Sequence, residues 1–385
     1  MKFYSGNTET YEKKGERRIL FRLWHIVFIM MGVAIFLFRS YIQLSPQKIE
    51  YGYSRAIYPY IASIQSLPAR WIPAPYSASE IFLTLIFVLV SVRLGYSVHI
   101  AVQKKELAGF FLKTSVDLCA LAAGIYFSYL TVWGFNYLRE PFAAALNQES
   151  PEHLQLADYE QLANDMIFLA NKLCTSDPCP ADGADDLRES DKAVDRSLGR
   201  VMDMARIPRI HSPPRTKFLF PGGFPDVLGI SGFFSPLFME PHVNSGLTAW
   251  EFPFVIAHEK AHLAGFASEA DAGFIAYLTC LTSASDTLRY SAALNILLAL
   301  RQYFPEEQWR ELLRTKLSQT VKNDMNARGK RIRHNHEKYA LFIRFSRKVN
   351  DTYLKLNSRK LGIRSYAAAL PRFAVWWKKQ RGMLF

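Results

Sequence analysis

The segment FVIAHEKAHLAGFASEADAGF, residues 254–274, decides how the rest of the sequence is interpreted. It contains the pattern His-Glu-x-x-His at His258, Glu259 and His262. A helix places residues four apart on one face, so both histidines can direct a ring nitrogen at one ion. Glu259 lies about 100° round the helix from His258, where it can act as a general base but not as a further ligand on that face. The apolar run PFVIA before the motif predicts a helix that passes through the interior of a domain.

A catalytic zinc ion needs a third protein ligand and one open position. Glu269 stands seven residues after His262, which is roughly 10 Å further along a straight helix. The chain can turn at Gly265, because glycine accepts the left-handed conformation that ends helices. We therefore expect a second helix, with Ser268 as its N-cap, that brings Glu269 to the ion. Asp271 is the alternative ligand, although a capping box with Ser268 would occupy its carboxylate.

Other residues near this segment are weaker candidates for the same site. The sixth residue after His262 is Ser268, so the third histidine of metzincins is missing. Lys260 should point away from the metal face. Four residues could line the cleft, each with an ordinary structural role as the alternative: Glu240, His242, Tyr353 and Tyr366.

Three apolar runs, residues 19–42, 81–102 and 115–135, approach the roughly 20 residues that cross a bilayer. Three buried helices of a soluble bundle are the alternative. Arg22 and Arg39 lie near the ends of the first run, where long side chains can reach the interface. No small-residue cleavage site follows this run, so it predicts a signal anchor rather than a cleaved signal peptide.

Lysine and arginine residues in the flanks predict the orientation. They are Lys13, Lys14, Arg17 and Arg18 before the first run, and Lys104, Lys105 and Lys113 between the second and third. Residues 1–18 then lie in the cytoplasm, whereas the loop 43–80 and the domain 138–385 lie outside it. We therefore predict a multi-pass protein of the plasma (inner) membrane, in contact with membrane lipids.

The domain after the third run has the pattern of a mostly helical fold. Helices are predicted near residues 157–173, 190–204 and 290–304, and residues 207–244, rich in proline, glycine and phenylalanine, predict short strands and turns. Cys174 and Cys179 can form a local disulfide outside the cytoplasm, with two free thiols as the alternative. Trp376 and Trp377 near the end of the chain could lie on a membrane surface.

The net charge of +13 sits in large part in the last 80 residues, as in RGKRIRHNHEKYALFIRFSRK at 328–348. Such a run is typical of nucleic-acid binding. An extracytoplasmic segment meets no nucleic acid, so we predict no such partner. Anionic headgroups, cell-envelope polymers and a simply solvated helix face are the remaining interpretations.

Four segments together resemble a known family. They are WGFNYLREP at 133–141, GISGFFSPLFMEPHVN at 229–244, PFVIAHEKAHLAGFASEADAGFIAYL at 253–278 and VNDTYLKLNSRKLGIRSY at 349–366. From the first apolar run to about Tyr366 the chain resembles the bacterial membrane family called domain of unknown function 3810. Its members are predicted to be membrane-anchored zinc peptidases of the zincin type, and their substrates are not established.

The resemblance implies a role for each residue of the motif. It makes His258 and His262 the metal ligands and Glu259 the catalytic acid, and it places Glu269 where gluzincin-like enzymes supply a glutamate ligand. One residue departs from the pattern. Four positions past this acid the family usually has a polar residue, which could orient a ligand, and this chain has Gly273.

The predicted fold is therefore a mainly α membrane protein with three N-terminal transmembrane helices, then a mostly helical zincin-like domain with a few short strands. The predicted function is hydrolysis of peptide bonds through a zinc-activated water, with one Zn²⁺ ion as cofactor and a peptide or protein as substrate. The alternative is a membrane-anchored binding or scaffold protein that retains a structural metal site, which Gly273 favours.

A third hypothesis is an intramembrane protease. It needs the motif inside an apolar span, and here charged residues crowd it, namely Glu251, Lys260, Glu269 and Asp271. The sequence leaves the substrate, the choice between endo- and exopeptidase, and the oligomeric state open.

Overall fold

The computed structural model describes residues 6–73, 75–103, 105, 107–174, 186–219, 224–357 and 366–384. Within these ranges the chain is mainly helical with a few short strands, as the sequence predicts. It divides into two compact units, one of Met1–Pro46 with Phe82–Phe135 and one of Gln47–Ile81 with Asn136–Phe385. Lys104 and Cys179 lie outside the described residues, so the predictions made on them stay predictions.

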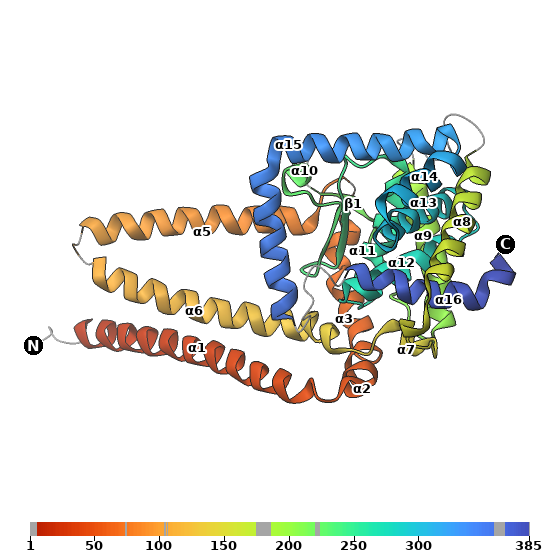
Figure 1. The fold of residues 1–385 in the computed structure, drawn as a ribbon. Coiled ribbons are helices and arrows are strands. Elements are labelled where there is room, and N and C mark those ends of the chain that lie inside the picture. The colour runs from red at the N-terminus through yellow and green to blue at the C-terminus, as the bar shows by residue number, and fades with distance from the viewer. Residues whose placement is uncertain are drawn as a thin grey trace, which may run out of the picture. The chain divides into compact units, whose positions relative to one another are not determined.

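The first unit contains the long apolar helices α1 (Gly6–Ile42), α6 (Leu107–Val132) and all but the first turn of α5 (Ala78–Gln103). Among the described residues, three segments are long and apolar enough to cross a membrane: Leu23–Ile42, Ala78–Gln103 and Phe110–Val132. α1 and α6 run side by side (Figure 1). A Cβ on Gly32 would lie 2.8 Å from the Cβ of Ala123. Small residues at this crossing therefore let the two backbones approach closely.

The second unit is built on a helical layer with a small sheet on one side (Figure 1). Strands β1 (Lys217–Phe218), β2 (Gly232–Ser235) and β3 (Glu240–Val243) form a sheet of order β1-β3-β2, parallel between β1 and β3 and antiparallel between β2 and β3. The helices are α2 (Pro46–Ile49), α3 (Tyr58–Gln65), α4 (Leu67–Trp71), α7 (Phe142–Ala145), α8 (Leu156–Leu173), α9 (Asp186–Met204), α10 (Phe224–Leu228), α11 (Phe252–Leu263), α12 (Glu269–Leu281), α13 (Asp286–Leu300), α14 (Glu306–Lys316), α15 (Gln319–Leu356) and α16 (Ala369–Leu384).

The core of this unit surrounds α11 and α12. α11 packs against α9, α12 and α13 on one side and against β2 and β3 on the other. Every residue of α12 is buried, as expected for a helix that is apolar nearly all round. The C-terminal helix α16 covers α12, and Trp377 is only 1% exposed. The prediction that Trp377 lies on a membrane surface is therefore wrong, because its ring fills the protein core.

Local sequence explains where α11 begins and ends. Glu251 accepts hydrogen bonds from the backbone N–H and hydroxyl of Thr248 at 3.0 and 2.8 Å, which forms a capping box just before the helix. At the other end Gly265 has a φ of +88°, which glycine adopts without a steric penalty. The Gly265 N–H donates to the His262 carbonyl and the Phe266 N–H to the Ala261 carbonyl. These two bonds are the Schellman motif that ends helices and reverses the chain.

A buried ion pair holds the sheet to the start of α5. Glu240 on β3 accepts hydrogen bonds from the backbone N–H groups of Ala78 and Ser79, from the Ser77 hydroxyl and from Lys217 Nζ on β1 at 2.7 Å. His242 bonds the same Ser77 hydroxyl at 2.9 Å. The acid thus satisfies the orphan donors of a helix N-terminus. Glu240 and His242 have structural partners and lie outside the group of residues that could hold a metal.

Replacing Glu240 by glutamine is expected to destabilise the second unit by about 3 kcal/mol, because Lys217 would stay charged and buried without its partner. Although burial alone would raise it, hydrogen bonds from Lys217 and Ser79 and the lysine charge lower the pKa of Glu240 from 4.5 to about 2. Its contribution is therefore complete above pH 4.5 and is lost as the pH falls towards 2. Melting temperature between pH 7 and pH 3 measures this, with the exposed Glu152→Gln as control. Equal pH slopes for the wild type and the Glu240 variant would contradict the assignment.

Candidate metal centre

The turn at Gly265 brings Glu269 back to the two histidines of α11. His258 Nε2 lies 3.0 Å from Glu269 Oε2, and His262 Nε2 lies 3.4 Å from the same oxygen. One ligand atom from each of the three residues lies within 4.8 Å of the other two. Two ligands bound at 2.0–2.1 Å to one tetrahedral zinc ion would be about 3.3 Å apart. The three side chains are therefore already gathered at close to the spacing that such an ion requires.

A hydrogen bond on the side of the ring away from Glu269 fixes the orientation of His262. Its Nδ1 lies 2.7 Å from the carbonyl oxygen of Phe266. A carbonyl only accepts, so Nδ1 donates and Nε2 is the nitrogen that faces Glu269. Such a backbone acceptor behind a ligating histidine is typical of protein metal sites. Burial alone would lower the pKa of His262, but the charge and hydrogen bond of Glu269 raise it to about 9. The charges of the histidines hold the pKa of Glu269 far below its ordinary value, against the effect of burial.

Glu259 is buried beside the gathered residues and next to the first residue of β2. It is 5% exposed, and burial raises its pKa to about 7, an effect that the two histidines oppose. A Cβ on Gly232, at the start of β2, would lie 2.5 Å from Glu259 Oε1. Because Gly232 has no side chain, it leaves the space that the carboxylate of Glu259 occupies. No role was predicted for Gly232, and its only signal in the sequence is a glycine before the bulky residues of β2.

Tyr366 is the one additional predicted cleft residue that the structure places at this site. Its ring stacks on that of His258, with centroids 6.2 Å apart and planes 13° apart. The side chains of Glu269 and of Asn350 on α15 lie beside its hydroxyl. The residue is 44% exposed, but its hydroxyl end is desolvated. That desolvation and the charge of Glu269 raise its pKa well above the ordinary value. Tyr353 contacts Tyr137, with the two hydroxyl oxygens 3.3 Å apart.

Asp271 does not lie at the metal centre. Its carboxylate accepts a hydrogen bond from the Phe142 N–H at 3.0 Å and pairs with Arg372 of α16. Ser268 is the N-cap of α12, but its side chain makes no capping hydrogen bond. The predicted capping box between Ser268 and Asp271 is therefore wrong, because the acid is used to join α12 to α7 and α16. Lys260 points away from the centre, as predicted, and it pairs with Asp191 and Asp195 of α9.

Side chains hold the turn between α11 and α12. They come from the parts of the chain just before α5 and just after α6. Tyr58 donates to the Leu263 carbonyl at 2.7 Å, and Arg139 donates to the Gly265 carbonyl at 2.9 Å. Arg139 also lies 3.8 Å over the Phe266 ring and pairs with Glu50, which pairs with Arg55 as well. Sequence reasoning missed these residues. The sequence does not show that Arg139 is buried or which acid it pairs with.

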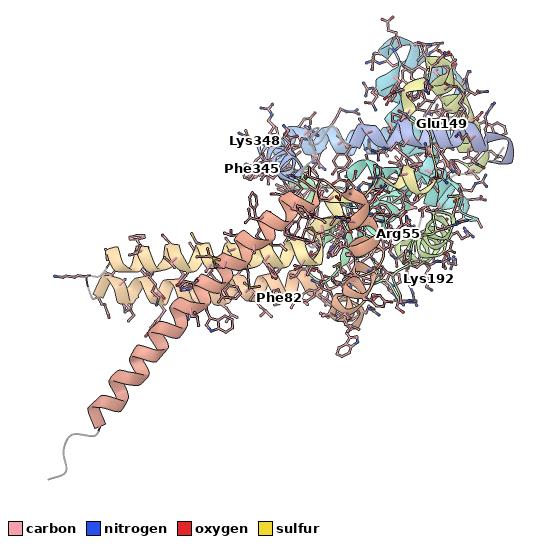
Figure 2. All side chains as sticks on the ribbon, turned by 90° about the horizontal axis from the view of Figure 1, so that it is seen from below. Arg55, Phe82, Glu149, Lys192, Phe345 and Lys348 are labelled. Carbon is pink, nitrogen blue, oxygen red and sulfur yellow. The ribbon has the colours of Figure 1, made fainter. Side chains whose placement is uncertain are left out.

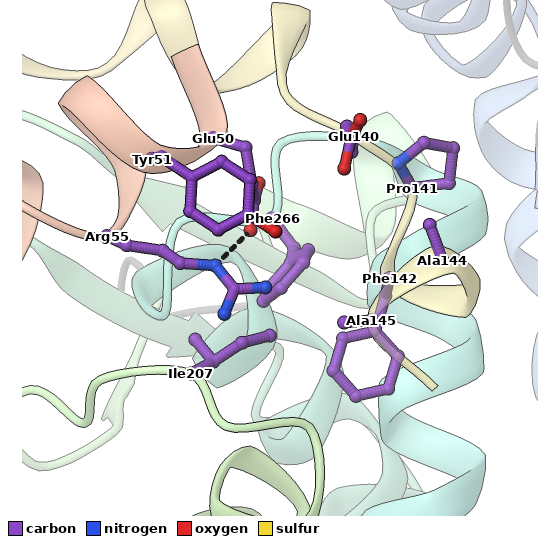
Figure 3. A pocket seen from close by; sticks show the side chains of 10 residues that line it. All are labelled: Glu50, Tyr51, Arg55, Glu140, Pro141, Phe142, Ala144, Ala145, Ile207 and Phe266. Atoms are coloured by element: carbon purple, nitrogen blue, oxygen red, sulfur yellow. Dashed lines mark hydrogen bonds and ion pairs between the residues drawn. The ribbon is translucent and has the colours of Figure 1, made fainter. Parts of the chain in front are cut away.

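A small cavity lies beside this anchor rather than at the metal centre (Figure 3). Its walls include Glu50, Arg55, Pro141, Ile207 and Phe266, and the figure shows Arg55 directed at Glu50. Its volume of ≈ 40 Å³ suits a few water molecules, since each needs about 10–15 Å³ on this measure. The cavity is too small to hold a peptide.

Gly273 is explained by helix packing. A Cβ at this position would lie 2.8 Å from the Cβ of Ala369 at the start of α16. The glycine therefore lets α12 and α16 cross closely. The sequence suggests that a polar residue which could orient a metal ligand is missing at this position. That suggestion does not explain why the chain has glycine, whereas the close contact with Ala369 does.

Replacing Gly273 by alanine is expected to destabilise the second unit by about 1 kcal/mol. Overpacking costs about 1–3 kcal/mol, and the better helix propensity of alanine returns at most about 1 kcal/mol. Ala369→Gly in the same chain should restore the packing. Thermal unfolding of the two single variants and the double variant measures this coupling. Additive effects in the double variant would show that the contact with Ala369 is not the cause.

A comparison with family models matches a range that includes parts of both units. One family model, described as "Protein of unknown function (DUF3810)", matches residues 53–371. No curated protein and no solved structure matches the chain. The matched range contains the gathered side chains of α11 and α12, the glycine of β2 and the tyrosine that stacks on the site. Because the match covers most of the sequence, the chain belongs to the DUF3810 family of proteins of unknown function.

Proposed function

We propose that this protein is a membrane-anchored zinc metallopeptidase. The observation that carries the proposal is the gathering of His258, His262 and Glu269 around one point, with the buried acid Glu259 beside them. Two imidazoles and one carboxylate form a ligand set found in catalytic zinc sites of peptidases, where a fourth position stays open. Side chains from several separate segments of the chain pack around this site. A helix that contained the motif only by chance would not need such packing.

The residues present fit the proposed chemistry. His258, His262 and Glu269 would hold the ion, which when bound supplies Lewis acidity towards a peptide carbonyl and a water molecule. Glu259 would accept the proton of the attacking water and pass it to the departing amine. A buried carboxylate next to the metal ligands is placed to take up and release a proton in these two steps. The sheet and α9 exclude water from the other sides of α11.

Membrane anchoring fits the division of the chain. The segments Gln47–Ile81 and Asn136–Phe385 belong to one compact unit, so both must lie on one side of a membrane that α5 and α6 cross in opposite directions. α1 would then separate this unit from the N-terminus. The lysines and arginines before α1 favour a cytoplasmic N-terminus. The proposed catalytic unit is accordingly extracytoplasmic.

The test is the metal content of the detergent-purified protein, measured by mass spectrometry. We expect about one zinc per chain in the wild type and its loss in His262→Ala and Glu269→Ala. The exposed neighbours His153 and Glu152 provide matched controls, because His153→Ala and Glu152→Ala should keep the metal. Loss in His262→Ala alone would move the third ligand elsewhere. A wild-type protein that binds no zinc even when zinc is supplied would refute the proposal.

A further inference from the structure

The second half of α15, residues 340–356, has two faces of different character. α15 bends at Tyr339, where φ is −125° and ψ is 23°, and Figure 1 shows the two halves running in different directions. On its inner face Ile343 and Leu354 are each 1% exposed. Ile343 packs on Gly229, where a Cβ would lie 3.2 Å from its Cγ2. Asn350, on the same face, lies beside the Tyr366 hydroxyl. The inner face thus holds this half against the second unit.

The outer face exposes large apolar side chains. They are Leu341, Phe342, Phe345 and Val349, which are 77%, 59%, 67% and 52% exposed. At 100° per residue these four, called here the α15 stripe, are centred roughly 145° round the helix from the inner face. Single exposed apolar residues are ordinary on protein surfaces, but a continuous row of this kind marks an interaction site.

Charged side chains border the α15 stripe. Arg344 and Lys348 are exposed and lie four residues apart along its edge. Figure 2 shows Phe345 and Lys348 projecting from the same segment of α15. A helix with an apolar face bordered by lysine and arginine is the pattern of segments that lie in the headgroup region of a bilayer. The same cations would disfavour burial in a purely apolar protein interface and favour contact with anionic headgroups.

The chain itself brings this half close to a membrane. Tyr353 makes its ring contact and hydroxyl contact with Tyr137. Tyr137 is five residues after Val132, where the third segment that could cross a membrane ends. Five residues span at most about 18 Å. The second half of α15 is therefore tethered within a short distance of the point at which α6 would leave the bilayer.

From these observations we propose that the second half of α15 is an interfacial helix that lays the α15 stripe into the surface of an anionic lipid bilayer. This inference does not depend on the proposed peptidase activity. The occupant of the exposed face is lipid, and Arg344 and Lys348 contact the headgroup phosphates. Burial of the apolar side chains supplies most of the attraction and the two cations select the charge of the surface.

The test places a probe on the full-length protein in vesicles. p-Azidophenylalanine is introduced at Phe345, or at Arg347 on a polar side of the same half as the matched control, and is coupled to an environment-sensitive fluorophore. The vesicles contain equal parts of phosphatidylcholine and phosphatidylglycerol. At position 345 we expect strong quenching by doxyl-labelled lipids and several-fold weaker quenching by aqueous acrylamide than at position 347.

Three results would overturn the proposal. Equal acrylamide quenching at both positions would show that the face is solvated. Shielding at position 345 without quenching by doxyl lipids would show that protein covers it, either the membrane helices of this chain or a second copy. The doxyl-lipid quenching at position 345 is also measured in vesicles of pure phosphatidylcholine and in the Arg344→Gln/Lys348→Gln variant. If it is unchanged in both, the helix does not select anionic lipid. The melting temperature is measured on the same samples and shows whether the labelled proteins are folded.

Discussion

Glutamine in place of Glu259 is expected to lower peptide hydrolysis by about 10²–10⁴-fold, the contribution of a general base, while about one zinc per chain remains bound. Glutamine has nearly the same shape, so it fits the space beside Gly232, but it cannot accept the proton of the attacking water. Glu259 is not among the gathered ligand residues, so metal binding should not depend on it. Metal retention with loss of hydrolysis separates a catalytic from a ligating role.

A proteome-derived peptide library suits this measurement, because mass spectrometry of its cleavage products needs no known substrate. The control is Glu152→Gln, an exposed glutamate of the same unit. If the Glu259 variant loses zinc as well, the acid is a ligand and the proposed mechanism is wrong. If wild type and variant both hold zinc and neither cleaves the library, a structural metal site in a binding or scaffold protein becomes the better account.

Alanine in place of Gly232 is expected to reduce hydrolysis by about 10²-fold with the metal retained. The added methyl group would lie 2.5 Å from Glu259 Oε1 and 2.6 Å from Val255 Cγ1. Both distances are below any real contact, so the carboxylate must move. A displacement of about 1 Å at a reacting group can cost 10²-fold in rate. The backbone of Gly232 does not need a positive φ, so alanine meets a steric conflict only at its side chain.

The matched control for this substitution is Gly52→Ala, because no atom lies within 4 Å of a Cβ at that position. Hydrolysis and zinc content are measured for both variants. A reduced kcat with bound zinc fits a displaced base. Full activity in Gly232→Ala would mean that Glu259 can adapt without loss, and the close fit to β2 would then have no catalytic meaning.

Much of the fold could be predicted from the sequence where the signal is local. The three apolar runs, the helices of the second unit and the turn at Gly265 follow from hydropathy, periodicity and glycine chemistry, each within a short window. The spacing of His258 and His262 on one helix is equally local. The placement of Glu269 beside them needed only the turn, which a glycine at the helix end announces.

The contacts between distant segments could not be predicted from the sequence. Nothing near Asp271 indicates that its carboxylate would bond Phe142 and Arg372 instead of forming a capping box. Trp377 follows an apolar run with lysines behind it, a pattern that suits a membrane surface and a protein core equally well. Its burial depends on α12 and α16 crossing at Gly273, and a single sequence does not show which helices cross.

The residues that hold the turn between α11 and α12 have a consequence for how the protein is made. Glu50 and Tyr58 are synthesised before α5, Arg139 after α6, and the carbonyls of Leu263 and Gly265 later still. The turn can close only when all of these segments have reached the same compartment. Under the proposed topology, maturation of the site would therefore wait until α5 and α6 have been inserted into the membrane. A protein trimmed to the residues after α6 would lack Glu50 and Tyr58, so a soluble version of the second unit must keep residues 47–81 joined to it.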